Sequence, residues 1–116
     1  MNIEDFRTYC LSKKGVTEGF PFGEETLVFK VLNKMFAATN IEWDEFAVNL
    51  KCNPERAIEL REQHPCIQPG YHMNKKHWNT VYFNDGTLSD DFLKALIDDS
   101  YDLVVQSIPK KIRENL

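Results

Sequence analysis

The residue types best suited to chemistry gather in residues 63 to 84, which contain no Asp or Glu although these supply 18 of the 116 residues. All three histidines fall inside this stretch. Its densest part, residues 69 to 80, reads PGYHMNKKHWNT and is called the knot below. Lysines, amides, imidazoles and aromatic rings at this density can grip phosphates, stack on bases or fasten a loop onto a sheet. The knot is therefore the first candidate for a functional surface.

The adjacent lysines Lys75 and Lys76 are the natural phosphate ligands of the knot, because no carboxylate nearby in the sequence neutralises them. Tyr71 and His72 precede them, and we expect both to be exposed at the rim of the same patch. A second basic run lies near the end of the chain. The predicted nucleic-acid contacts are therefore Lys75, Lys76, Tyr71, His72, Lys110, Lys111 and Arg113. On the alternative interpretation, the lysines only occupy a solvated turn between strands.

The other polar and aromatic residues of the knot have structural interpretations. Trp78 is in phase with Thr80 and Tyr82, and we expect it to pack in the core if that face of the strand meets helices. Asn74 and Asn79 could read adenine edges. Asparagine beside a turn more often bonds to the backbone, so we predict structural roles for both.

Metal binding and catalysis find little support in the sequence. Zinc ligands come in closely spaced pairs, and the spacing of His64, Cys66, His72 and His77 matches no structural zinc pattern. Of the three cysteines, only Cys66 lies near a histidine, and the chain has neither a Gly-rich phosphate loop nor a nucleophile elbow. We therefore expect no catalytic residues, no metal and no cofactor, and a protein that is not an enzyme.

Composition bounds the class of protein. A chain of 116 residues, 42% of them hydrophobic, suits a single domain spanning residues 1–116. The net charge of -4 excludes a strongly basic coater of nucleic acid, so any DNA binding must use a local patch. The odd number of cysteines, the polar start and the absence of a long apolar run predict a cytoplasmic location without membrane contact. Cys10 and Cys52 are expected to be small core residues.

The elements that must position the knot follow from periodicity and turn signals. Asn2 is expected to cap the first helix, Asn33-Lys34 to form the tip of a hairpin, and Asn53-Pro54 to start the second helix. Asp98, Asp99 and Asp102 are expected at a solvated helix end. We predict helices over 3–13, 54–64 and 101–107, and a further helix that is capped at 89–91 and carries Phe92, Leu93, Leu96 and Ile97. The predicted strands span 19–23, 26–32, 35–40, 45–51 and 77–83. This order predicts an α+β, two-layer sandwich with an antiparallel sheet of about five to six strands and helices mainly on one face.

Several motifs together resemble the MmcQ/YjbR family of small bacterial proteins, and the resemblance covers nearly the whole chain. The motifs are PFG at 21–23, FKV at 29–31, KMFA at 34–37, LKC at 50–52, PGYHMNKKHWN at 69–79, SY at 100–101 and PKK at 109–111. Asn33 departs from the pattern, since relatives tend to have Gly there, but both suit a tight turn. The resemblance implies a two-layer α+β fold, compared with double-wing DNA-binding domains and with secretion-chaperone-like domains. It carries no catalytic residue set.

Two functions therefore compete. The first is weak or non-specific DNA binding by a local basic and aromatic patch, in a monomer or weak homodimer. The second is a non-enzymatic, secretion-chaperone-like interaction module that binds a protein partner through an open sheet face or an edge strand. A small-molecule pocket lined by Trp78, Tyr82 and His77 is a third possibility. The two main hypotheses differ in one geometric requirement, because DNA binding needs the knot lysines and the C-terminal basic run on one surface.

Overall fold

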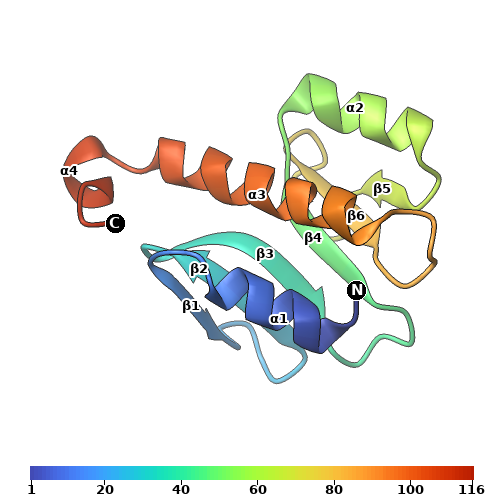
Figure 1. Cartoon of the computed structure of the whole chain (residues 1–116), viewed down its shortest axis with the longest axis horizontal. Helices are drawn as coiled ribbons and strands as arrows, with labels where there is room; N and C mark the ends of the chain where they lie inside the picture. Colours follow the sequence, from blue (N-terminus) through green and yellow to red (C-terminus); the bar gives the residue numbers. More distant parts are fainter.

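The computed structural model describes all residues, 1–116, and has the predicted α+β architecture (Figure 1). Along the chain, the elements are α1 (Ile3–Leu11), β1 (Val16–Gly19), β2 (Thr26–Val31), β3 (Lys34–Asn40), β4 (Ala47–Lys51), α2 (Pro54–Gln63), β5 (Ile67–Pro69), β6 (Trp78–Tyr82), α3 (Asp90–Ser107) and α4 (Lys110–Arg113). None of the four helices combines the length and the apolar character of a membrane-spanning helix.

The six strands form one antiparallel sheet in the order β1-β2-β3-β4-β6-β5, which confirms the predicted fold class. The predicted hairpin is present, with its tip one residue earlier than expected. Leu32 and Asn33 have φ angles of 47° and 70°, the pair of positive values that a tight hairpin turn requires. Asn tolerates this conformation readily, and the strand pairing on both sides holds Leu32 in it.

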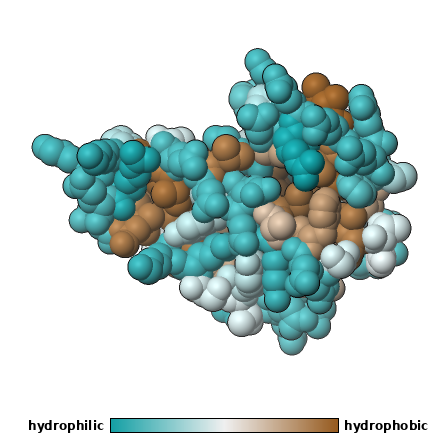
Figure 2. Space-filling view, turned by 45° about the horizontal axis from the view of Figure 1, so that its top comes forward, coloured by the Kyte–Doolittle hydropathy of each residue, from teal (hydrophilic) through white to brown (hydrophobic).

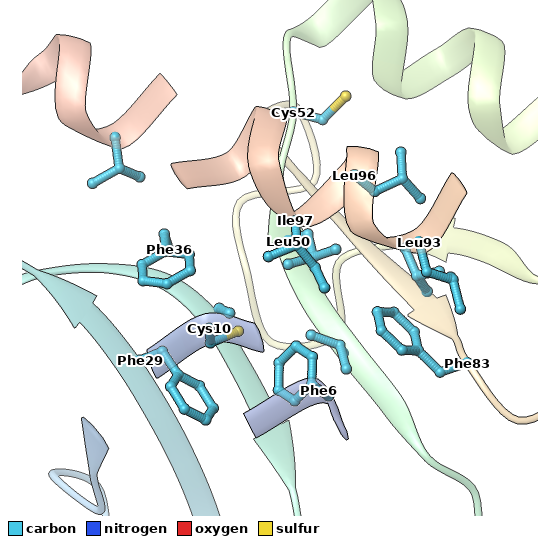
Figure 3. Packing of buried hydrophobic residues seen from close by; sticks show 14 of the residues in the cluster. Phe6, Cys10, Phe29, Phe36, Leu50, Cys52, Phe83, Leu93, Leu96 and Ile97 are labelled. Carbon is cyan, nitrogen blue, oxygen red and sulfur yellow. The ribbon is translucent and has the colours of Figure 1, made fainter. Parts of the chain in front are cut away.

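Helices cover one face of the sheet and leave the other open. Figure 1 shows α1 and α3 crossing the same face, while α2 packs at the end formed by β5 and β6. A cluster of 21 buried residues fills the space between the two layers (Figure 3). At its centre, the ring of Phe6 makes edge contacts with Phe29, Phe46 and Phe83 at centroid distances of 5.3 to 5.6 Å. Cys10 and Cys52 are buried in this cluster, as predicted.

Ser100 ties α3 to the sheet from within the core. The ladder between β2 and β3 shifts register beside Phe36, which leaves the carbonyl of Phe36 for another donor. The Ser100 hydroxyl donates to that carbonyl at 2.5 Å and accepts the backbone N–H of Lys51 at 2.8 Å. A fully buried polar side chain is thus satisfied on both sides, and it spans β3 and β4.

The predicted order of elements needs correction in three places. α3 is one continuous helix of 18 residues, so Asp98, Asp99 and Asp102 lie in its middle and not at a helix end. The strand predicted over 19–23 ends at Gly19, because Pro21 lacks a donor and Gly23 has a φ of 125°. The strand itself starts earlier, at the β-branched residues Val16 and Thr17. β5 was not predicted because three residues are too few to show an alternating pattern.

Candidate functional site on the open face of the sheet

The knot is fastened to the helix layer by Arg61 of α2. Its Nε donates to the Oδ1 of Asn79 at 2.7 Å, and an Nη2 N–H reaches the carbonyls of Lys75 and, at 3.5 Å, Trp78. The Asn79 side chain, which is 2% exposed, also donates to the carbonyl of Ala57 at 3.4 Å. One guanidinium thereby fixes both the loop and the strand that follows it, as a planar group with several donors can.

Both asparagines of the knot have the structural roles predicted for them. Asn74 Oδ1 accepts the backbone N–H of Lys76 at 2.9 Å, and Asn79 is engaged by Arg61 and α2. Gly70 is needed because a Cβ atom there would lie 2.9 Å from the Cβ of Trp78. The backbone of the knot is therefore packed directly on β6.

Trp78 is half-buried and lies outside the hydrophobic core, contrary to its predicted core position. The prediction was conditional on helices covering its face of β6, and the helices cover the opposite face, where Val81 lies.

Two hollows of about 580 and 670 Å³ occur on the open face, and of the three residues expected to line a small-molecule pocket only Tyr82 borders them. Trp78 and His77 do not, so the expected combination does not form around these hollows.

The structure brings Tyr71, His72, Lys75 and Lys76 together in the knot. The rings of Tyr71 and His72 make a tilted contact with their centroids 4.1 Å apart, and both residues are exposed, as predicted. Lys76 is exposed, whereas the ammonium of Lys75 donates to the carbonyl of Gly70 at 2.9 Å. The residues of this half of the predicted patch therefore lie together, although the ammonium of Lys75 is partly used in a hydrogen bond within the knot.

The C-terminal half of the predicted patch lies elsewhere. Lys110, Lys111 and Arg113 lie in α4, and the side chain of Leu116 after them packs near Gly15, just before β1. The knot joins β5 to β6, at the sheet edge opposite β1. Figure 1 shows α4 and the β5–β6 end at opposite ends of the molecule. The convergence of the two basic segments that DNA binding was expected to use is therefore absent.

The open face carries a groove that the sequence did not reveal. Its floor follows one row of paired residues across the sheet, Ala38, Asn49 and Thr80. Three loops rise around this floor: residues 20–25, residues 41–46 and the knot. The two hollows meet at Trp43 and Tyr71, whose rings make an edge contact at 5.5 Å and which line both. We call the two hollows together the aromatic groove.

The walls of the aromatic groove are unusually apolar for an exposed surface. Phe22 is 73% exposed, Tyr71 53% and Trp43 37%, and Met35 and Met73 add to the lining of the first hollow. Phe20, in the loop of residues 20–25, and Ile41, in the loop of residues 41–46, are also exposed. Exposed aromatic side chains grouped around a hollow are typical of binding surfaces.

The polar atoms of the floor are already paired within the chain. Thr80 Oγ1 accepts the backbone N–H of Tyr71 at 2.9 Å and donates to Asn49 Oδ1 at 2.5 Å, and Asn49 Nδ2 donates to the Tyr71 carbonyl at 3.2 Å. No buried side-chain nitrogen or oxygen in the protein lacks a partner. The floor consequently offers few free donors or acceptors, and recognition in the groove falls to its apolar walls and its rim.

The rim is acidic. The two loops beside the knot carry five carboxylates and no lysine or arginine, namely Glu24, Glu25, Glu42, Asp44 and Glu45. None of them belongs to an ion pair. The backbone N–H of Ile41 donates to the carbonyl of Glu25 at 2.8 Å, which keeps the two loops side by side. Among the residues that line the groove, Lys75 is the one lysine or arginine.

The helix-covered side offers a less suitable site. Figure 2 shows that much of this side is hydrophilic, with hydrophobic atoms gathered in a depression beside α2 and near α4. A crevice of about 280 Å³ between α2 and α3 is lined partly by Arg56, Asp99 and Asp102. Burial raises the pKa of Cys52, at the edge of this crevice, and raises that of Cys10 to about 12, so both thiols stay protonated near neutral pH. No group of three His, Cys, Asp or Glu side chains is placed to hold a metal ion.

Trp43 and Phe22 are the site residues that the sequence analysis missed. Both lie in loops, where neither helical nor strand periodicity assigns a hydrophobic residue to the core. Trp43 stands in the segment IEWDE, between acidic residues, and Phe22 precedes Gly23-Glu24-Glu25. An aromatic residue surrounded by acids in a turn segment was the available signal, because such a residue has little reason to be there for folding alone.

Comparison with known proteins agrees with the resemblance to the MmcQ/YjbR family. The YjbR family model matches residues 11–103. The chain is 36% identical over 116 residues to the uncharacterized protein YjbR of Escherichia coli K12, covering 100% of this chain and 98% of that protein. It is 40% identical over 92 residues to the uncharacterized protein YbdF of Escherichia coli O157:H7, covering 79% and 75% of the two chains.

Solved structures of similar proteins have the same fold. The crystal structure of Deinococcus radiodurans protein DR2400, of domain family DUF419, has a TM-score of 0.90 and 45% identity, covering 98% of this chain and 86% of that one. A crystal structure of a Pseudomonas syringae protein has a TM-score of 0.75 and 32% identity, covering 89% of this chain and 98% of that one. The chain therefore belongs to the YjbR family.

Proposed function

We propose that this protein is a non-enzymatic interaction module and that the aromatic groove is the surface on which it binds a protein partner. The observation that carries the proposal is the exposed set of Phe22, Trp43 and Tyr71 around a sheet face that no helix covers. Burying such rings against a partner is favourable, and the contact between Trp43 and Tyr71 at 5.5 Å orients two of them before binding. Because the polar atoms of the groove floor are already hydrogen-bonded within the chain, the floor suits apolar side chains better than groups that need hydrogen bonds.

The open face suits a partner better than the sheet edges do. β1 has four residues, and β5 has three and ends in Pro69. Short edges with proline discourage the addition of a further strand. Of the two surfaces expected for an interaction module, the open face is therefore the one that we propose.

DNA binding by the knot is the second candidate. The exposed rings of Tyr71 and His72 beside exposed Lys76 support it, because aromatic and basic groups together bind single strands. The separation of α4 from the knot and the acidic rim weigh against it, because both reduce the attraction to phosphates. We rank it below the interaction module for this reason.

The proposal also covers the absence of catalysis, the cellular compartment and the oligomeric state. Protonated, buried thiols and the lack of a nucleophile–base pair support a function without catalysis. Three free cysteines support a reducing compartment such as the cytoplasm. We propose that the protein acts as a monomer or weak homodimer.

A peptide selection tests the proposal directly. Random peptides displayed on phage would be selected on the wild type and depleted on a Phe22→Ser/Trp43→Ser variant. Enriched peptides should bind the wild type with a Kd of about 1–100 μM, as expected for a small interface, and at least ten-fold more weakly to the variant. Ile58→Ser is the matched control, since Ile58 is 54% exposed on α2, away from the groove.

The same preparations decide between the two candidates. Labelled duplex and single-stranded oligonucleotides would be titrated at about 50 mM salt, where electrostatic association is strong. The interaction module predicts flat titrations. Salt-dependent binding that is lost in Lys75→Glu/Lys76→Glu, together with no groove-dependent peptides, would replace the proposal with DNA binding.

A further inference from the structure

The charges around the aromatic groove are strongly one-sided. Glu25 lines the first hollow, and Asp44, Glu45 and Lys75 line the second, so three carboxylates face one ammonium. The ammonium of Lys75 is already bound to the carbonyl of Gly70 at 2.9 Å. The carboxylates have no ion-pair partner within the chain. A group that enters the groove therefore meets a negative field.

We propose that the aromatic groove selects a basic, extended peptide segment, with a lysine or arginine side chain between the rings of Trp43 and Tyr71 and the carboxylates of the rim. The inference rests on the proposed interaction function and specifies the chemistry of the partner. A cation is attracted both to the faces of aromatic rings and to carboxylates. Both kinds of group occur here on one hollow, and each is free of an internal cation.

The saturated floor explains why the cation should be part of a longer apolar segment. Asn49 and Thr80 bind each other and the backbone of Tyr71, so the floor gives a free ligand few hydrogen bonds. Affinity must then come from apolar contact with rings such as Phe22, and orientation from the charge. An extended chain that alternates apolar and basic residues can place its apolar side chains on the floor and its cations toward the rim.

Anionic ligands fit the groove poorly for the same reasons. A phosphate or an acidic peptide would face three carboxylates, and the one ammonium that lines the groove, that of Lys75, is bound within the knot. Like charges at an interface weaken binding and slow association. The charge of the groove thus distinguishes between partners that its apolar walls alone would accept equally.

Three labelled peptides would test the inference by fluorescence anisotropy. The first alternates leucine and arginine over eight residues, the second has citrulline in place of arginine, and the third has glutamate. Citrulline keeps the size and planarity of arginine but has no charge. At about 50 mM salt, where screening is weak, the arginine peptide should bind at least ten-fold more tightly than the citrulline peptide. The glutamate peptide should bind least.

The variant that removes the rim charge is Glu25→Gln/Asp44→Asn/Glu45→Gln. Its preference for arginine over citrulline should fall to within about three-fold, as loss of several rim charges predicts. The matched control is Glu55→Gln/Glu59→Gln/Glu62→Gln on α2, which changes the net charge equally at exposed positions on the other layer. This control should retain the ten-fold preference, which separates the field of the groove from the charge of the whole protein.

The outcomes distinguish the two levels of the proposal. Equal, groove-dependent binding of the arginine and citrulline peptides would overturn the cation preference and leave the interaction module standing. Binding of none of the three peptides, with no groove-dependent peptide from the selection, would overturn both. Sedimentation of the wild type should show no association that depends on the rim carboxylates. Such association would assign the groove to a second copy of the chain and overturn the inference of a separate basic partner.

Discussion

Removing Arg61 tests whether the knot is held in place as the structure indicates. In Arg61→Met, the Oδ1 of buried Asn79 loses its 2.7 Å donor and the carbonyl of Lys75 loses its bond to Arg61, whereas the carbonyl of Trp78 keeps the N–H of Gly70 at 3.0 Å. An unsatisfied buried amide costs about 1–3 kcal/mol, and hydrogen bonds from a charged donor are at the upper end. The exposed carbonyl of Lys75 recovers water and adds little. We expect the free energy of unfolding to fall by about 2–4 kcal/mol, which lowers Tm by about 8–15 °C in a domain of this size.

The assay is urea unfolding followed by circular dichroism, with the change read from the midpoint at constant slope. Arg56→Met is the matched control on the same helix, because Arg56 has only an exposed contact with Glu59 at 3.8 Å. It should cost no more than about 0.5 kcal/mol. A double-mutant cycle of Arg61→Met with Asn79→Ala should show strong coupling. A cost of Arg61→Met equal to that of the control, or strict additivity with Asn79→Ala, would refute the fastening role of Arg61.

Three further changes follow from other contacts within the fold. Ser100→Ala leaves the Phe36 carbonyl and the Lys51 N–H without their side-chain partner, so the free energy of unfolding in urea should fall by about 2–3 kcal/mol. Ser100→Cys keeps the volume of the side chain but weakens both hydrogen bonds. If Ser100→Cys lowers the free energy of unfolding as much, the loss is not caused by a cavity alone. The bond from Tyr9 to the Asp98 carboxylate, with burial, raises the pKa of Tyr9 from 10.0 to about 12, so its stabilisation is complete below pH 10 and is lost as the pH rises to about 12. Tyr9→Phe should remove that part of the alkaline transition, and an unchanged transition would contradict the assignment. Burial raises the pKa of Asp99 and repulsion from Asp102 and Asp98 adds to this, although Arg56 opposes it; the ionised form therefore destabilises the fold increasingly as the pH rises from the ordinary pKa to the raised one. Asp99→Asn should therefore raise Tm at pH 7, by about 1–3 °C after solvent screening, and leave it unchanged near pH 3.

The elements that could be predicted from the sequence are those with local signals. Asn2 and Asn53 accept the N–H groups of the first helical turn, as their positions before α1 and α2 predicted. The hairpin of β2 and β3 follows from alternation on both sides of a turn. β5 and the full length of α3 escaped prediction, because pairing of a three-residue strand with β6 and docking of α3 on the sheet are tertiary effects.

The candidate site could be predicted in part. The exposure of Tyr71 and His72 and the structural use of Asn74 followed from local rules for loops and turns, whereas the contacts of Asn79 are with distant residues of α2. The partner of the knot, Arg61, lies 14 to 18 residues earlier in the chain and is brought to it only by the packing of α2. The separation of the two basic runs depends on the strand order β1-β2-β3-β4-β6-β5, which places β1 and the β5–β6 pair at opposite edges. No short stretch of the sequence indicates this strand order.

Tyr71 connects the fastening of the knot to the shape of the aromatic groove. Its N–H donates to Thr80 and its carbonyl accepts from Asn49, while its ring contacts Trp43 and His72. The backbone bonds fix where the ring stands, and the ring forms the wall shared by both hollows. Loosening the knot at Arg61 should therefore weaken peptide binding even though Arg61 does not line the groove. In this view the lysines, amides and glycine of the knot are needed to place one aromatic wall, and the ligand chemistry resides in the acidic loops beside it.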